Sequence, residues 1–129
     1  MSRRARGLDK LQQRLDYSFT SPDLLERALT HSSALSPARR IERSYQRLEF
    51  LGDRVLGLVV ADMLYQRFPL SNEGDLSRLL NTLVRKETCA EIARQLGLGG
   101  EMILGDSEAR SGGAEKDAIL GDVTEAVIG

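Results

Sequence analysis

The chain has 129 residues, of which 41% are hydrophobic and only 5% aromatic, so it can bury one core made mostly of aliphatic side chains. Its 18 basic and 19 acidic residues give a net charge of −1, which argues against a surface that holds a polyanion by charge alone. With one cysteine, no signal-peptide core and no apolar run long enough for a membrane span, the composition predicts a protein of the reducing cytoplasm.

Apolar residues recur at intervals of three and four along most of the chain, which is typical of amphipathic helices. This spacing predicts helices at residues 8–19, 21–33, 45–67, 71–86, 87–97 and 114–129. Ser21 is the expected N-cap of the second helix, with Pro22 at its first position, and Pro69 stops the third. Loops are expected at the basic segment 35–44 and at 97–113, which holds six glycines.

No segment alternates with a period of two, so the sequence predicts an all-α helical bundle. Residues 55–61 are apolar nearly all round, which indicates that the 45–67 helix is buried at the centre. Gly52 is expected to allow close helix packing, and Cys89 to lie in the core. Because the chain stops at "EAVIG", in mid-helix by pattern, we expect one domain over residues 1–129 that is a fragment of a longer protein.

Two pairs of carboxylates adjoin apolar helical segments. Glu49 and Asp53 lie only about 40° apart on a helical projection, and Gln46 shares their face one turn earlier. Asp122 and Glu125 repeat the pattern in the last helix. Carboxylates gathered in apolar surroundings cannot all stay ionised, and a divalent cation such as Mg²⁺ removes that cost.

The alternative is that both pairs lie on solvated helix faces, where such spacing is common. Against it stand the apolar neighbours of each pair and the absence of a matching lysine stripe that would offer salt bridges.

Four sequence blocks then point to one family. They are "ALTHSS" at 28–33, "QRLEFLGDRVLGL" at 46–58, "FPLSNEGDLSRLLNTLVRKETCAEIA" at 68–93 and "SGGAEKDAILGDVTEAVIG" at 111–129. In content and order they resemble the motifs of the endonuclease domain of bacterial ribonuclease III. The resemblance covers nearly the whole chain, and a chance match of four ordered blocks is very improbable.

The resemblance implies an all-α endonuclease domain that cleaves double-stranded RNA as a homodimer, with Mg²⁺ or with Mn²⁺ in its place. It implies products with 5′-phosphate and 3′-hydroxyl ends, and a role in the processing of ribosomal and messenger RNA. It assigns the metal to Glu49, Asp53, Asp122 and Glu125, and catalysis to Asp53 and Glu125. The family's double-stranded RNA-binding domain is not in this chain.

Four further residues receive weaker assignments from the resemblance. Gln46 stands where the family usually has Glu, so it can accept a hydrogen bond but brings no charge. Glu73 is either a secondary acidic group of the site or a helix N-terminal charge. His31 either contacts RNA or caps the C-terminus of a helix, and Phe50 is either a dimer contact or an ordinary core residue.

Two other functions remain as alternatives. A non-catalytic RNA-binding relative would have lost metal ligands, whereas all four carboxylates are present here. A helical nucleotide pyrophosphohydrolase also uses acidic helices and Mg²⁺ but would lack the G-D-L-S and L-T-H-S blocks. No nucleotide cofactor is expected, because the glycines at 97–100 lack the Lys-Ser/Thr of a phosphate loop.

Overall fold

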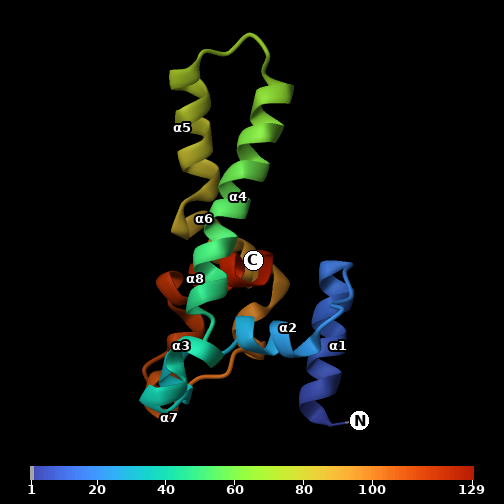
Figure 1. Ribbon diagram of the computed structural model, residues 1–129, viewed down its shortest axis with the longest axis vertical. Coiled ribbons are helices and arrows are strands. Elements are labelled where there is room, and N and C mark those ends of the chain that lie inside the picture. Colours follow the sequence, from blue (N-terminus) through green and yellow to red (C-terminus); the bar gives the residue numbers. More distant parts are fainter. Residues whose placement is uncertain (1) are drawn as a thin grey trace.

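The computed structural model describes residues 2–129 and is an all-α structure, as predicted (Figure 1). Its α-helices are α1 (Arg3–Leu15), α2 (Pro22–Ala28), α3 (Arg40–Arg43), α4 (Gln46–Arg67), α5 (Glu73–Val84), α6 (Lys86–Leu96), α7 (Asp106–Arg110) and α8 (Asp117–Ile128). Short 3₁₀ turns are η1 (Ser32–Ala34), η2 (Pro37–Arg39), η3 (Leu98–Glu101) and η4 (Gly113–Glu115). One isolated parallel bridge joins Thr30 and Ile103.

Capping chemistry sets several helix boundaries. The Ser2 hydroxyl accepts a hydrogen bond from the Ala5 amide at 3.0 Å, so α1 begins five residues earlier than predicted. It ends at Leu15 because Asp16 adopts the left-handed conformation, with φ of 52°. The predicted start of α2 at Pro22 is confirmed, although the Ser21 side chain makes no capping hydrogen bond.

The two predicted loops contain short helical segments. Residues 35–44 contain η2 and α3, and the Arg40 side chain links α3 to η1 and the residue after it by donating to the carbonyls of Ser32 and Leu35, at 3.2 and 3.3 Å. In residues 97–113, η3 and α7 flank the bridge at Ile103. The chain also breaks at Arg85, whose extended backbone separates α5 from α6.

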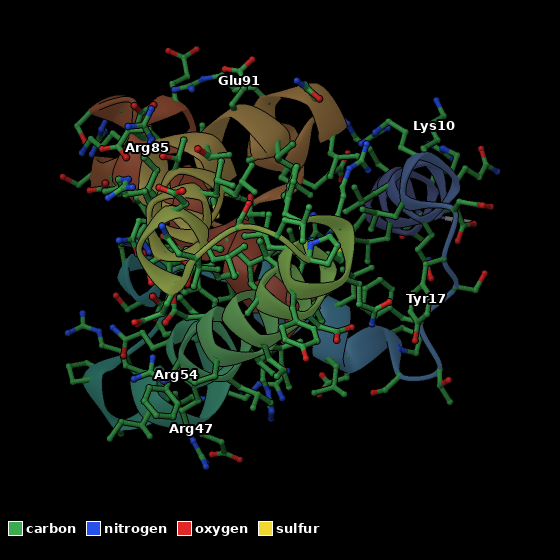
Figure 2. All side chains as sticks on the ribbon, turned by 90° about the horizontal axis from the view of Figure 1, so that it is seen from above. Lys10, Tyr17, Arg47, Arg54, Arg85 and Glu91 are labelled. Carbon is green, nitrogen blue, oxygen red and sulfur yellow. The ribbon has the colours of Figure 1, made fainter. Side chains whose placement is uncertain are left out.

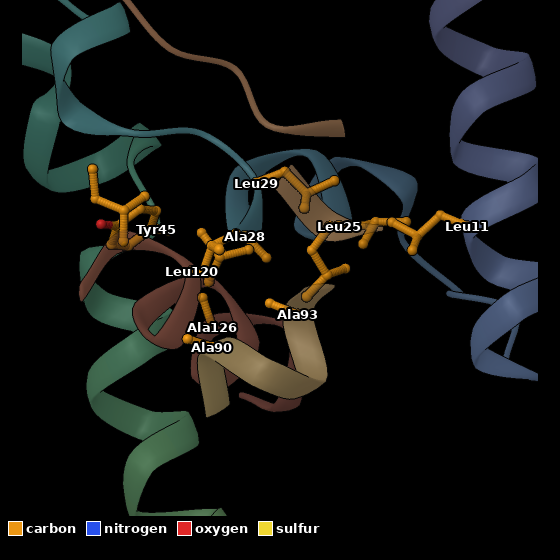
Figure 3. Close-up of a cluster of buried hydrophobic side chains, with 12 residues drawn as sticks. Leu11, Leu25, Ala28, Leu29, Tyr45, Ala90, Ala93, Leu120 and Ala126 are labelled. Atoms are coloured by element: carbon orange, nitrogen blue, oxygen red, sulfur yellow. The ribbon is translucent and has the colours of Figure 1, made fainter. Parts of the chain in front are cut away.

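The most buried helix is α8. Its inner surface packs between α4 and α6, and residues of α2 close the core from one side (Figure 3). The buried hydrophobic cluster consists of Leu11, Leu25, Ala28, Leu29, Tyr45, Ala90, Ala93, Leu98, Ile119, Leu120, Val123 and Ala126. Cys89 is buried as predicted. Small side chains at positions 90, 93 and 126 let the α6 and α8 backbones approach closely.

The prediction that α4 is buried on all sides is wrong. Its first half packs on α8 and its second half pairs with α5, and the two helices leave the body as a projecting arm (Figure 1). Leu58 and Tyr65 are therefore 72% and 74% exposed. The apolar side chains of α4 do lie on several sides of the helix, but the rest of this chain covers only some of them. Within residues 2–129, no helix combines the length and the apolarity that crossing a membrane requires.

Gly52 marks the contact between α4 and α8. A Cβ atom built there would overlap the backbone carbonyl of Glu125, so only glycine lets the two backbones come this close. The expectation of close helix packing at Gly52 is confirmed. Gly57, further along the same helix, has no atom within 4 Å of its Cβ position.

This contrast predicts opposite effects of the same substitution on stability. Gly52→Ala should lower the free energy of unfolding by about 1–3 kcal/mol or more, because the added methyl group overpacks a backbone contact. Gly57→Ala should raise it by up to about 1 kcal/mol, because alanine is the better helix former. Denaturant unfolding followed by circular dichroism measures both. Equal effects at the two positions would contradict a tight crossing at Gly52.

Candidate metal centre

Three carboxylates from two helices converge where α4 crosses α8. Glu49 comes from the first turn of α4, and Asp122 and Glu125 lie on successive turns of α8. Each offers one oxygen, and these oxygens all lie within 4.8 Å of one another. Glu49 and Asp122 are half-buried, whereas Glu125 is only 2% exposed. The crossing at Gly52 thus brings together groups that are more than 70 residues apart in the chain.

A lysine from a third helix faces this carboxylate cluster. The ammonium of Lys86, at the start of α6, lies 2.5 Å from Asp122 Oδ1, 2.7 Å from Glu125 Oε1 and 3.5 Å from Glu49 Oε1. The sequence shows no lysine stripe beside these carboxylates, yet a single lysine forms salt bridges with them. Helical spacing reveals only neighbours on the same helix, whereas Lys86 reaches the cluster from another one.

Burial makes Glu125 an unusual acid. Desolvation raises its pKa to about 7, against the opposing hydrogen bond from Lys86, and the nearby Asp53 carboxyl adds to the rise. Glu125 Oε2 is buried and has no hydrogen-bond partner among the described residues. Burying a hydrogen-bond acceptor without a partner costs free energy, so a ligand that binds this oxygen would stabilise the site.

Lys86 stays charged. Partial burial lowers its pKa, but the hydrogen bonds to Asp122 and Glu125 outweigh that effect and hold the pKa above its ordinary value.

Tyr45 holds Asp122 from the other side. Its hydroxyl donates to Asp122 Oδ2 at 3.2 Å, and burial followed by the charge of Asp122 raises the tyrosine pKa above its ordinary value, so the donor stays protonated. The ring of His31 packs edge-on against Tyr45, with centroids 5.7 Å apart. Tyr45 was not expected at the site from the sequence, and its only signal is its place one turn before Glu49.

His31 does not cap the C-terminus of a helix. The helix α2 ends at Ala28, and His31 Nδ1 instead accepts a hydrogen bond from the Ser33 amide at 3.1 Å, which caps the start of η1. That structural alternative is therefore wrong, and an RNA contact of His31 stays a prediction.

The remaining sequence-predicted residues lie outside the cluster. Asp53 is half-exposed and pairs with Arg54 at 3.0 Å, although its carboxyl is near enough to affect Glu125. Gln46 is exposed at the first position of α4. Glu73 is the first residue of α5, at the tip of the arm and distant from α8 (Figure 1).

Phe50 is not a core residue. It is 60% exposed, and its ring carries the Arg54 guanidinium at 4.1 Å from the ring centre. A surface hollow of about 870 Å³ opens beside it, lined in part by Ile41 and Leu48.

The donor set fits a hard divalent cation. Glu49, Asp122 and Glu125 supply carboxylate oxygens, the ligands that Mg²⁺ and Mn²⁺ prefer. The unpartnered Glu125 Oε2 supplies a further oxygen in a position that water does not reach. Such an ion would also favour the ionised form of Glu125, against the burial and the neighbouring Asp53 carboxyl that raise its pKa.

Known proteins with this fold carry a shared function in their names. The Ribonuclease 3 proteins of Rhodopseudomonas palustris and Bradyrhizobium diazoefficiens are 56% and 50% identical over 119 and 131 residues. These matches take in 92% and 99% of this chain, but only 43% and 52% of the relatives, so the chain spans about half of their length.

A solved structure extends the likeness to three dimensions. The nuclease domain of ribonuclease III from Campylobacter jejuni superposes with a TM-score of 0.86 at 42% identity, covering 93% of this chain and 80% of that one. That structure is described as showing structural flexibility in a region involved in dimer formation. The family model for ribonuclease-III-like domains matches residues 21–129. The chain belongs to the ribonuclease-III-like family.

Proposed function

We propose that the chain hydrolyses phosphodiester bonds in double-stranded RNA with the help of Mg²⁺, or of Mn²⁺ in its place. The observation that carries the proposal is the convergence of Glu49, Asp122 and Glu125 on one point, with a buried carboxylate oxygen left without a partner. Family membership and the names of the relatives support the same activity.

The chain's own residues have distinct proposed roles. Glu49, Asp122 and Glu125 would hold the ion, and Asp53, whose carboxyl lies beside Glu125, would turn from Arg54 to join them. Tyr45 fixes the orientation of Asp122 through its hydrogen bond. The ion would supply polarisation of the scissile phosphate and a water of lowered pKa. We place Asp53 and Glu125 closest to the chemistry, because Asp53 is the accessible carboxylate beside the buried one. Products would carry 5′-phosphate and 3′-hydroxyl ends.

Duplex RNA is the proposed substrate, in the processing of ribosomal and messenger RNA. An A-form helix is read through its backbone and 2′-hydroxyls, which requires local positive charge more than a high net charge. Arg47 and Arg54 project outward together from α4 (Figure 2). Arg54 is adjacent to Asp53 in the chain. A phosphate group bound by Arg54 and a phosphodiester bond at the carboxylates can therefore belong to the same RNA strand. We retain His31, beside Tyr45, as a weaker RNA contact.

We also propose a homodimer. The exposed apolar side chains of α4 and the adjoining loop and helix are Phe50, Leu51, Leu58, Val59, Met63, Tyr65, Phe68, Leu70, Leu79 and Leu83. So much exposed apolar surface along α4 and the arm is typical of an interface. A twofold axis would place the same patch on both chains, with each Phe50 available to the hollow beside its counterpart.

The first test is Glu125→Gln, which keeps the shape of the side chain but removes its charge. Cleavage of labelled duplex RNA at moderate Mg²⁺ should fall by about a thousandfold or more, the equivalent of about 4 kcal/mol of transition-state stabilisation. Circular dichroism should show an unchanged fold.

The matched control is Glu91→Gln on the outer surface of α6, where the side chain points away from the molecule (Figure 2). This variant should cleave like the unmodified protein. Near-normal turnover by Glu125→Gln would refute the assigned role of Glu125.

The dimer is tested by Phe50→Ala. Truncating a central aromatic anchor should raise the dimer dissociation constant by about thirtyfold, equivalent to about 2 kcal/mol, as measured by sedimentation. Tyr17→Ala removes an aromatic residue of equal exposure near α1 and should leave the constant unchanged. A pure monomer at micromolar concentration before any substitution would overturn the dimer itself.

A third test concerns the charge at Gln46, one turn before Glu49. Gln46→Glu should lower the Mg²⁺ concentration for half-maximal cleavage, because an added anion attracts the cation by about 1 kcal/mol or more at a partly solvated site. Binding of duplex RNA in Ca²⁺ should change little. Gln13→Glu adds the same charge on the exposed face of α1 and serves as control. Overlaying Mg²⁺ titrations for folded, dimeric proteins would reject a charge role at Gln46.

A further inference from the structure

Lys86 occupies the point on which the carboxylate cluster converges. Its ammonium contacts Asp122 and Glu125 at 2.5 and 2.7 Å and lies 3.5 Å from Glu49. These are the three residues whose oxygens come together as candidate ligands. A single positive charge therefore faces three carboxylates and neutralises them only in part.

The aliphatic stem of the Lys86 side chain packs against α8. A Cβ atom at Gly121, on α8, would overlap Lys86 Cδ and lie 2.7 Å from Cγ, so the stem crosses α8 through space that only glycine leaves open. Gly121 directly precedes Asp122, which aligns the stem with the cluster. About a third of the side chain nevertheless reaches solvent, at 36% exposure, so the ammonium has an exit.

We infer that Lys86 is a tethered counter-cation that exchanges with the divalent ion at the carboxylate cluster. The inference rests on the metal site of the proposed function. The Lys86 ammonium lies within 3.5 Å of oxygens of all three carboxylates, so a divalent ion at about 2.0–2.6 Å from those oxygens would need the space between them that the ammonium fills. The two cations also repel each other across a short distance. Lys86 therefore withdraws toward solvent when the ion enters.

The exchange has two consequences that oppose each other. In the metal-free protein, Lys86 limits repulsion among Glu49, Asp122 and Glu125 and so stabilises the crossing of α4 and α8. During metal binding, its contacts must break, so it weakens the affinity for the ion. Lys86 is thus a positioning residue that sets the metal concentration at which the site fills.

The first experiment measures metal binding without any RNA. Lys86→Met keeps the length of the apolar stem and removes the charge. Calorimetric titration with Mn²⁺ should give a dissociation constant about tenfold lower than that of the unmodified protein. The melting temperature of the metal-free variant should be lower, and its increase on saturation with Mn²⁺ should be larger.

Arg85→Met is the matched control. It removes a positive charge one residue earlier, from an exposed side chain at the edge of the molecule whose ion pair is with Glu87, at 3.9 Å (Figure 2). Its Mn²⁺ affinity should match that of the unmodified protein. Equal or weaker affinity in Lys86→Met would overturn the exchange. Absence of Mn²⁺ binding by both Lys86→Met and the unmodified protein would overturn the exchange and the proposed metal site together.

A second measurement needs no variant. The chain has three lysines, Lys10, Lys86 and Lys116, so their side-chain carbon resonances can be resolved after selective labelling. Titration with diamagnetic Ca²⁺ should shift the ε-carbon of Lys86 and leave those of exposed Lys10 and of Lys116, paired with Glu108, in place. An unchanged Lys86 signal at saturating metal would show that the ammonium does not move and would overturn the exchange.

Discussion

The close contact of two helix backbones at Gly52 positions the carboxylate cluster. Because no side chain intervenes, α4 rests directly on the carbonyl of Glu125 in α8. That contact fixes the distance between the first turn of α4, which carries Glu49, and the last turns of α8. The carboxylate cluster is therefore a consequence of how closely two backbones approach, and it needs no loop to hold it in place.

The same contact creates an electrostatic conflict in the metal-free protein. Glu125 is buried under α4, and burial raises its pKa to about 7. Lys86 and Tyr45 supply hydrogen bonds to the cluster, yet one oxygen of Glu125 has no hydrogen-bond partner within residues 2–129. Stability alone would favour an apolar residue at position 125. A buried acid in this position is understandable as part of a site whose ligand completes it, which agrees with the family to which the chain belongs.

The fold class and most helices could be predicted from the sequence, because helical periodicity and caps are local signals. The carboxylate positions followed from spacing and from the resemblance to the ribonuclease III family. The contact of Lys86 with the carboxylates could not be predicted from the sequence. Lys86 approaches from another helix, and residue spacing along one helix does not reveal contacts with a different helix. The exposure of Leu58 was missed for a related reason. An apolar pattern shows that a surface tends to be covered, but not whether the cover belongs to the same chain.

Glu73 illustrates a further limit of the sequence. Resemblance to the family suggested either a part in the site or a helix N-terminal charge. Glu73 is the first residue of α5, and the arm formed by α4 and α5 places it away from the carboxylate cluster of the same chain, so a role in the site stays a prediction. Phe50 shows the reverse. It was expected to be either a dimer contact or an ordinary core residue. Its exposure beside Arg54 excludes the core position, and the dimer contact stays a prediction. For both residues, the direction in which the helix leaves the core decides where the side chain lies.

Glu49, Asp122 and Glu125 are proposed to form a divalent cation site that Lys86 occupies until the ion arrives. Crystals of the protein grown with Mn²⁺ and measured at the manganese absorption edge would locate the ion. We expect an anomalous peak within coordination distance of carboxylate oxygens from both α4 and α8, with the Lys86 ammonium moved off Asp122 and Glu125. A crystal structure obtained with Mn²⁺ that shows no peak at the cluster would rule out this site. A peak elsewhere, with Lys86 still bridging the carboxylates, would do the same.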